Sequence, residues 1–187
     1  MAERRVTQTE QIKALTHPLR VRLLELFRDG REMTATEAAT ATGESVASCS
    51  FHLRQLAMYG YLEPGERRGR EKPWKAIAGT VTIDAEPGDA EGLAATFAAG
   101  RALLAESVRS LDRWMDTAAD DDPEWTHSSH QRHAGFWATR EELSAVAEEI
   151  DHVLDRFADR AADPAKRPAD ARHVRFLSAL WSERPPS

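Results

Sequence analysis

The pattern of hydrophobic and polar positions over residues 34–75 predicts a helix, a tight turn, a second helix and a hairpin. Thr34 and Glu37 have the spacing of a capping box at the start of the first helix, and Gly43 supplies a residue that ends a helix easily. This order of elements is that of a winged helix-turn-helix, in which the second helix enters the DNA major groove. Double-stranded DNA is therefore the expected partner.

The second helix of this motif is expected over residues 46–59, with Ser45 as its N-terminal cap. Its hydrophobic positions recur at spacings of three and four, which predicts one buried stripe made of Val46, Cys49, Leu53 and Leu56. The opposite face is small at its start and polar further on, as a groove-reading helix requires. The side chains expected to face the groove are Ser45, Ala47, Ser48, Phe51 and Gln55, with Arg54 beside them.

The hairpin that follows is expected to run from residue 61 to residue 77, with turn residues at 64–65 and 69. Its tip is strongly basic. The cations expected to contact phosphates or a minor groove are Arg67, Arg68, Arg70 and Lys72. The alternative is an ordinary charged loop in water, but a basic wing at this distance from a helix-turn-helix favours DNA contact.

The same segment resembles the ArsR-type winged-helix repressors over roughly residues 8–78. The residues that carry the resemblance are Leu15, Pro18, Arg20, Leu23 and Leu24, then Cys49, Ser50, His52, Leu53 and Leu56. The resemblance implies a dimeric transcription regulator whose second motif helix reads the groove. Typical metal-sensing members carry a cysteine motif in the first motif helix, which here reads TATEAATATG. The metal-sensing role is therefore not expected at that position.

Ahead of the motif, residues 1–6 are polar and are expected to fray, and residues 9–16 predict a short helix. Pro18 fits the first turn of the next helix, where its missing N–H costs nothing. Arg20 lies off the hydrophobic face of that helix, and a phosphate and an acidic side chain are equally expected as its partner.

After the hairpin, residues 80–89 are expected to be a linker and residues 90–117 a long helix. The helix carries a stripe at close to heptad spacing, formed by Leu93, Phe97, Leu104, Val108, Leu111 and Met115, with Gly100 at a point of close approach. The stripe can pack within its own domain or against a second copy. We favour the second copy, because groove-reading helices usually act in pairs on half-sites.

The C-terminal part predicts a second capping box, Thr139 with Glu142, at the start of a helix over residues 140–161. Short strands are expected at residues 135–138 and 173–181, paired as a small hairpin. This region is rich in aromatic residues, which form either a core or an apolar effector pocket. The residues expected to line such a pocket are Trp114, Trp125, Phe136, Trp137 and Trp181.

Composition narrows these expectations. The net charge is −6, but residues 1–79 hold 13 basic and 10 acidic side chains, whereas residues 80–187 hold 12 and 21. The positive N-terminal part is the one expected to meet DNA. The single cysteine excludes a disulfide framework and a Cys-x-x-Cys metal site, and no nucleophile or dinucleotide signature predicts an enzyme or a cofactor. There is no apolar run of membrane-spanning length and no secretory signal, so we expect a cytoplasmic protein.

The fold class expected is mainly α with a small β component. Residues 1–79 are the predicted winged helix-turn-helix, and residues 90–187 the predicted helical domain for dimerisation and effector binding. The protein is expected to be a sequence-specific, homodimeric transcription regulator. It is expected to act as a repressor that a small-molecule effector releases from DNA. Two alternatives remain: a winged helix that binds a protein, and a metal-responsive regulator that uses His127, His130 and His133, which are spaced three residues apart.

Overall fold

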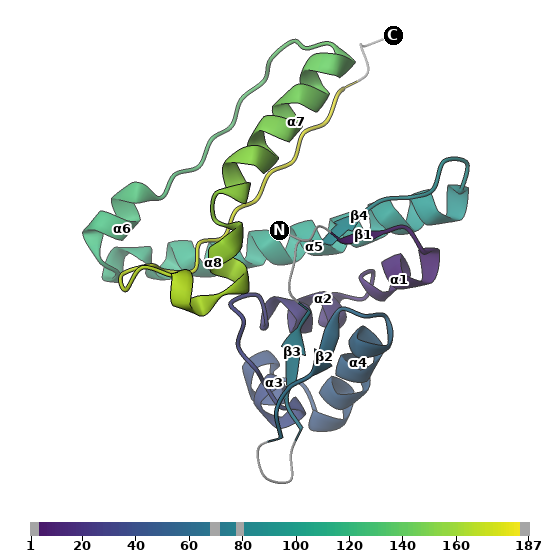
Figure 1. Cartoon of the computed structure of the whole chain (residues 1–187), viewed down its shortest axis with the longest axis vertical. Helices are drawn as coiled ribbons and strands as arrows, with labels where there is room; N and C mark the ends of the chain where they lie inside the picture. The colour runs from purple at the N-terminus through teal and green to yellow at the C-terminus, as the bar shows by residue number, and fades with distance from the viewer. Residues whose placement is uncertain (1–3, 68–71, 78–80, 184–187) are drawn as a thin grey trace. The chain divides into compact units, whose positions relative to one another are not determined.

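The computed structural model describes residues 4–67, 72–77 and 81–183 (Figure 1). Contacts between Cα positions divide the chain into two compact units, residues 1–110 and 111–187. The division falls inside the helix α5, Ala90–Thr117, which is the long helix expected from the sequence. Each unit is described separately below.

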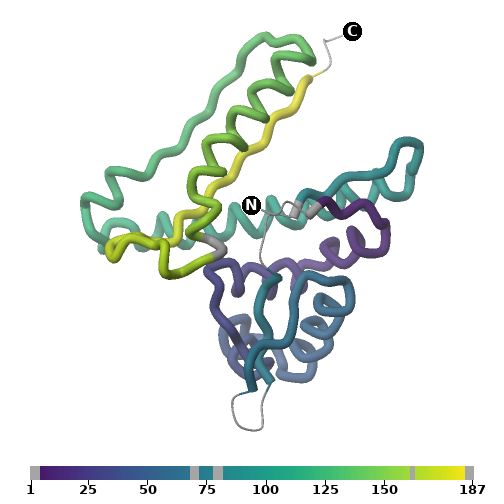
Figure 2. Tube along the Cα trace, viewed as in Figure 1, coloured from purple at the N-terminus to yellow at the C-terminus, as the bar shows by residue number. Residues whose placement is uncertain are grey.

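The first unit is a small helical domain with two pairs of short strands (Figure 2). Its elements before α5 are β1 (Arg4–Val6), α1 (Thr9–Ala14), α2 (Pro18–Glu25), α3 (Ala35–Thr42), α4 (Val46–Met58), β2 (Leu62–Pro64), β3 (Trp74–Ala76) and β4 (Val81–Ile83). Pro18 occupies the first turn of α2, as its fixed φ angle and missing N–H predict.

The hydrophobic core of this unit lies between α1, α2, α3, α4 and β2. Its large, fully buried side chains are Ile12, Leu15, Val21, Leu23, Phe27, Leu53, Leu56 and Leu62. Burying each large side chain stabilises the folded state by roughly 1.5–3 kcal/mol relative to leaving it exposed to water. This burial is the main stabilising contribution in so small a domain. The core therefore fixes α4 rigidly against the two helices before it.

Residues 4–6 form part of a strand pair, contrary to the expectation that residues 1–6 fray, while residues 1–3 lie outside the described residues. β1 pairs in parallel with β4, with Val6 opposite Ile83, and Val6 is buried. The amide of Asp84 continues the ladder by donating to the Val6 carbonyl at 3.1 Å. The pairing joins segments that lie more than 70 residues apart, so no local pattern in residues 1–6 could have indicated it.

The start of α5 is attached to α1 by polar contacts. The Thr9 hydroxyl donates to the Asp89 carboxylate at 2.8 Å, and the Lys13 ammonium lies 2.6 Å from Glu91 and 2.8 Å from Glu10. Hydrogen bonds to Glu10 and Glu91 raise the pKa of Lys13 well above its usual range. The N-terminal part of α5 therefore belongs to the same unit as the helix-turn-helix segment.

Two different faces of α5 have different surroundings. The buried face of α5 consists of Gly92, Ala95, Ala99 and Glu106. The heptad stripe lies on another face, and five of its members are exposed hydrophobic side chains: Leu93, Phe97, Leu104, Val108 and Met115. Gly100 lies on the same face, and a Cβ added there would meet nothing within 4 Å. Gly100 is thus not a point of close approach within the chain.

The described part of the second unit contains the end of α5 and five further short or medium helical segments. These are η1 (Ala118–Asp120), α6 (Pro123–Ser128), α7 (Arg140–Asp155), α8 (Ala158–Ala162) and η2 (Pro164–Lys166). Thr139 and Glu142 form the predicted capping box of α7. The helix stops at Asp155, before the expected residue 161, because the chain turns at Arg156 and Phe157 and starts α8.

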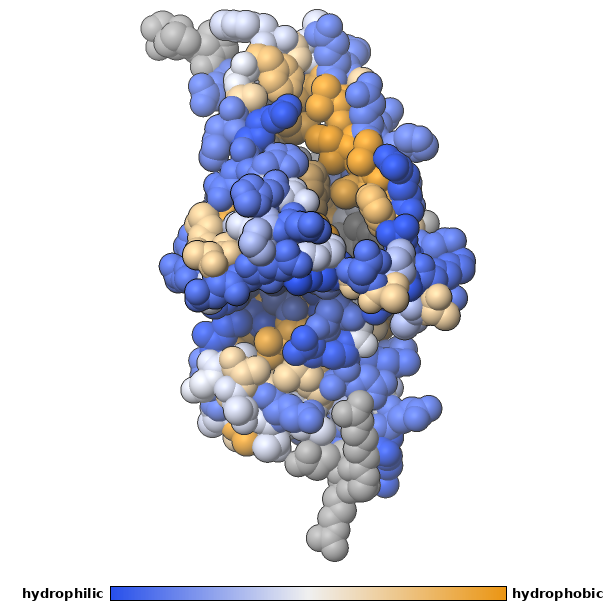
Figure 3. All heavy atoms as spheres, turned by 90° about the vertical axis from the view of Figure 1, so that its left-hand side faces the viewer, coloured by the Kyte–Doolittle hydropathy of each residue, from blue (hydrophilic) through white to orange (hydrophobic). Residues whose placement is uncertain are grey.

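The hairpin expected in the C-terminal part is absent, and its prediction was wrong. Residues 90–183 contain no strand, and residues 135–138 and 173–181 are irregular, extended chain. In the view of Figure 1 the two segments run on either side of α7. Their hydrophobic side chains are exposed, and hydrophobic residues gather on the upper part of the space-filling view in Figure 3. An alternating pattern thus produced extended chain without the backbone partner that makes a strand.

Candidate nucleic-acid interface

The start of α3 and the turn between α3 and α4 have the geometry that their sequence predicts. The Thr34 hydroxyl accepts from the Glu37 amide at 3.2 Å, while the Glu37 carboxylate accepts from the Thr34 amide at 2.7 Å. Gly43 ends α3 in the left-handed region with φ +71°, where an L side chain would be strained. The two helices pack closely on one another and on α2, so the turn holds α4 at a fixed angle.

Arg22, on α2, contacts both sides of the turn between α3 and α4. Its guanidinium donates to the Thr42 carbonyl at 2.7 Å and lies 3.1 Å from the Glu44 carboxylate. The Thr42 hydroxyl also lies 3.5 Å from the Cys49 sulfur, on the buried side of α4. These contacts satisfy a carbonyl at the end of α3 that has no partner within its own helix.

Helix α4 is capped by Ser45, whose hydroxyl accepts from the Ser48 amide at 3.1 Å. Three of the four expected stripe residues, Cys49, Leu53 and Leu56, are fully buried. Val46 is not, with 46% of its surface exposed. It lies in the first turn of α4, at the edge of the buried face. The hydrophobic spacing of the helix extends to Val46, but the core does not cover its side chain.

The exposed face of α4 carries a line of four side chains at spacings of four, three and four: Ala47, Phe51, Arg54 and Met58. Phe51 and Met58 are 51% and 64% exposed. Of the other side chains expected to face the groove, Ser48 and Gln55 are half-buried on the flank of this line, and the Ser45 hydroxyl is used as the cap. Nothing in the structure bears on DNA contact by these residues, which stays a prediction.

Phe51 is in contact with two histidines, so that three aromatic rings form a row from α4 to α2. His17 caps α2, accepting from the Leu19 amide at 3.2 Å, and its ring lies 4.4 Å from that of His52. The ring of His52 in turn meets Phe51 edge to face, with centroids 5.1 Å apart. Burial, and next the charges of neighbouring cations such as Arg20, lower the pKa of both histidines. Both rings are therefore held neutral to lower pH than usual.

The wing is the antiparallel pair β2–β3, in which Glu63 lies opposite Lys75. The Gly65 amide donates to the Pro73 carbonyl at 2.9 Å, which brings the two sides of the tip together. Arg67 and Lys72 are exposed beside the tip, whereas Arg68 and Arg70 lie outside the described residues. The Lys75 ammonium lies 3.1 Å from the Glu63 carboxylate, so its charge is partly neutralised within the wing.

Within the described residues, Arg20 contacts backbone carbonyls and not the acidic side chain that was one of its two expected partners, while contact with a DNA phosphate stays a prediction. Its guanidinium donates to the carbonyl oxygens of Ala14 and Lys13, the latter at 3.1 Å, at the C-terminal end of α1. Burial lowers its pKa. A cation on the last carbonyls of a helix is a common stabilising arrangement. The spacing of six residues from Ala14, across a turn, offers no helical signal that could have shown this contact.

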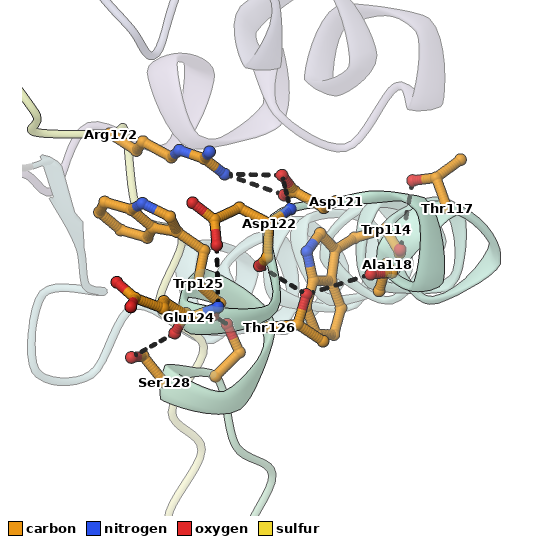
Figure 4. Close-up of polar contacts among 11 residues, drawn as sticks. Trp114, Thr117, Ala118, Asp121, Asp122, Glu124, Trp125, Thr126, Ser128 and Arg172 are labelled. Carbon is orange, nitrogen blue, oxygen red and sulfur yellow. Dashed lines mark hydrogen bonds and ion pairs between the residues drawn. The ribbon is translucent and has the colours of Figure 1, made fainter.

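The five aromatic residues expected to line an effector pocket differ in burial. Trp114 and Trp125 are half-buried, while Phe136, Trp137 and Trp181 are exposed, Trp137 completely. The Arg172 guanidinium lies 4.7 Å from the Trp125 ring and 2.9 Å from the Asp121 carboxylate, and this hydrogen bond lowers the pKa of Asp121. Figure 4 shows Trp125 directed towards Arg172 and Trp114 directed elsewhere.

The three histidines of the metal alternative do not share one helix. His127 lies in α6, whereas His130 and His133 lie in the irregular chain that follows it, and all three are exposed. Among the residues that the structure describes, no group of three histidine, cysteine, aspartate or glutamate side chains is arranged to hold a metal ion. Nor does any helix in the described part combine the length and the apolar character needed to cross a membrane.

Comparison with known proteins identifies the segment that holds this interface. Residues 15–60 match the family model described as a helix-turn-helix domain. Curated proteins gave no match. Solved structures that are similar include the homodimeric winged helix-turn-helix DNA-binding domain of a possible ArsR-family transcriptional regulator from Mycobacterium bovis, at 22% identity, covering 66% of this chain and 85% of that one with a TM-score of 0.34.

A second similar structure is described as a possible transcriptional regulator for arsenical resistance. It is 28% identical over 60% of this chain and 97% of its own, with a TM-score of 0.33. Likenesses of this size add no weight to the assignment, which stands on the family model and on the capped, packed α3–turn–α4 arrangement. The N-terminal part of the chain is a helix-turn-helix domain, completed by the β2–β3 wing.

Proposed function

We propose that this protein is a sequence-specific, homodimeric DNA-binding transcription regulator that inserts α4 into the major groove. The observation that carries the proposal is the position of α4 within a helix-turn-helix domain. One side is fixed by Cys49, Leu53 and Leu56 in the core, and the other side is exposed along its whole length. A helix that is rigid on one side and accessible on the other can be carried into a groove without unfolding.

The wing supplies the expected backbone contacts. Arg67 and Lys72 are exposed at its tip, and Arg54 is exposed on α4. Phosphate contacts of this kind position a protein on the duplex and make its affinity depend on salt. The sequence places Arg68 and Arg70 in the same tip, and we assign them the same role.

The homodimer is proposed to form through the exposed stripe of α5. The five large hydrophobic side chains on that face recur over more than 20 residues at close to heptad spacing, and a second α5 would cover them. Gly100 lies within the stripe with open space beside it, which lets a second helix approach closely. Two copies joined in this way would present two α4 helices to half-sites about one DNA turn apart.

Repression is the mode that the ArsR resemblance implies, and the proposed effector region is the second unit, residues 111–187. Its large hydrophobic side chains, including Phe136, Trp137 and Trp181, are exposed in the single chain. An apolar small molecule that bound there in only one state of the dimer would shift the DNA-binding equilibrium.

The test is binding of the purified full chain to a labelled duplex from upstream of its own gene. Fluorescence anisotropy is measured at several salt concentrations, with a scrambled duplex as competitor. Tight binding that resists the scrambled competitor and weakens as salt rises is expected. Weak binding that is equal for duplexes covering the whole upstream region and for the scrambled control would contradict the proposal.

A second function is favoured by one feature of α4. Phe51 and Met58 are large, exposed hydrophobic residues on the helix that would read the groove, and such residues also occur at the centre of protein interfaces. A winged helix that bound a protein through this face would show no salt-dependent affinity for any duplex. The anisotropy series therefore separates the two functions.

A further inference from the structure

We infer that α4 recognises the C5-methyl groups of pyrimidines in the major groove, chiefly thymines, through the apolar surface formed by Ala47 and Phe51. The inference rests on the proposed function, since it requires α4 to enter the groove. It goes further by naming the chemical group that is read and the side chains that read it.

The geometry of α4 directs the inference to these two residues. The buried side chains Cys49, Leu53 and Leu56 fix the direction of the core, and Ala47 and Phe51 lie on the opposite side of the helix. Both belong to its N-terminal half, next to the Ser45 cap. In helix-turn-helix proteins it is the N-terminal residues of the second helix that reach the base edges. Met58 lies on the same line but at the far end of α4.

The chemistry of that surface excludes most forms of base recognition. Methyl and phenyl groups offer no hydrogen bonds. The polar side chains around them are the exposed Arg54, assigned above to a phosphate, and the half-buried Ser48 and Gln55 on the flank. Every major-groove edge presents hydrogen-bond donors or acceptors, and the C5-methyl group of thymine is the one alkyl group on the major-groove edges of the four bases. Cytosine methylated at C5 presents the same group. A phenyl ring placed against any other edge would bury polar groups without partners.

Phe51 is oriented before it meets DNA. Its ring meets His52 edge to face, and the His52 ring packs at a tilt against His17, which is fixed as the cap of α2. Half of the Phe51 surface is nevertheless exposed, so the ring is supported on one side and accessible on the other. A side chain held in this way loses little rotamer freedom on binding, which favours a specific apolar contact.

The experiment compares two forms of the same DNA. A pool of duplexes with a random core is selected for binding to the full-length protein. The selected sequences are then amplified with either thymidine or deoxyuridine triphosphate, so that the second form lacks every thymine methyl group. Affinities of the wild type, Phe51→Ala and the control variants Met58→Ala and Gln55→Ala are measured for both forms by anisotropy. Thermal unfolding of each variant shows that the exposed substitutions leave the fold intact.

The wild type is expected to bind the uracil form about fourfold more weakly for each methyl group contacted, which is on the order of tenfold or more for two half-sites. Phe51→Ala should bind the two forms almost equally, because the contact is already missing. Met58→Ala and Gln55→Ala should keep the wild-type ratio whatever their absolute affinity. A further comparison replaces a contacted thymine with either cytosine or 5-methylcytosine. The duplex with 5-methylcytosine should bind more tightly than the duplex with cytosine, because the C5-methyl group is restored.

Equal binding of both forms by the wild type would overturn the inference, as would an unchanged ratio in Phe51→Ala. Either result leaves the proposed function intact, provided that selected duplexes bind better than the starting pool. If no duplex is enriched and binding does not respond to salt, the proposed function fails together with the inference. The apolar face of α4 would then be a surface for a protein.

Discussion

The imidazole ring of His52, on α4, packs against the ring of His17, which caps α2, with centroids 4.4 Å apart and a tilt of 38° between the ring planes. The contact connects the proposed recognition helix to the helix beneath it through two titratable groups. Arg20 is nearby, and the acidic Glu44 acts in the opposite sense on both rings. The Nδ1 atom of His52 is buried and has no hydrogen-bond partner among the described residues.

This pair predicts a loss of stability in mild acid. Both histidines have a pKa below the unfolded value of 6.5, so above that pH they are neutral in both states and contribute nothing. As the pH falls below 6.5, the unfolded chain binds protons first, and the free energy of unfolding decreases until the folded pKa values are passed. We expect the melting temperature to fall between pH 7.5 and 5.5.

The matched variant is His17→Asn, because asparagine keeps a good N-terminal cap on α2 and removes one titrating ring. Its melting temperature should depend less on pH over the same interval than that of the wild type. An identical pH dependence in the two proteins would show that the pKa of His17 does not change on unfolding.

The capping box of α3 predicts a stability effect that is separate from any DNA contact. Thr34 is buried, and its hydroxyl and backbone exchange two hydrogen bonds with Glu37. Thr34→Ala should lower the free energy of unfolding by about 1 kcal/mol in urea titrations. Thr40→Ala, an exposed change within the same helix, should have little effect. Equal losses in the two variants would contradict the role given to the cap.

The wing predicts a difference between two lysines. Lys72 is exposed at the tip, whereas Lys75 is paired with Glu63 at 3.1 Å. Lys72→Ala and Arg67→Ala should each weaken binding to all duplexes and reduce the slope of log affinity against log salt by about 0.9. Lys75→Ala should reduce the slope less, since its charge is already partly neutralised. The assignment would be wrong if Lys75→Ala gave the larger change.

The stripe on α5 predicts the oligomeric state. Phe97→Glu and Leu104→Glu place charges in the exposed apolar face and should convert a dimer into monomers in sedimentation equilibrium. The control Ala105→Glu adds the same charge to an exposed position away from the stripe and should leave the dimer intact. A dimer that survived both stripe variants would have to form through another surface.

Local signals allowed much of the first unit to be predicted. The capping box at Thr34, the glycine at 43 and the hydrophobic period of α4 act over a few residues, and the structure confirms all three except at Val46. The long helix α5 was also predicted, with its bounds, because its hydrophobic period continues from residue 90 to residue 117 and no proline interrupts it.

What could not be predicted depends on contacts between distant segments. The β1–β4 pair and the contacts of Arg20 with the end of α1 join groups that no period connects. The opposite error occurred at residues 135–138 and 173–181, where alternation suggested strands although no neighbouring backbone completes a ladder. In the interface itself, sequence spacing placed Phe51 and Ala47 on one face but could not show that His17 and His52 support the phenyl ring.

The most direct test of the account is a footprint of the full-length protein on its selected duplex, with hydroxyl radicals for the backbone and dimethyl sulfate for guanine N7 in the major groove. Two α4 helices carried by one dimer should protect two patches whose centres lie about 10–10.5 base pairs, or a multiple of that spacing, apart. Phe97→Glu should abolish the paired pattern. A single patch, or protection confined to the minor groove, would contradict the claim that α4 reads the major groove from a dimer.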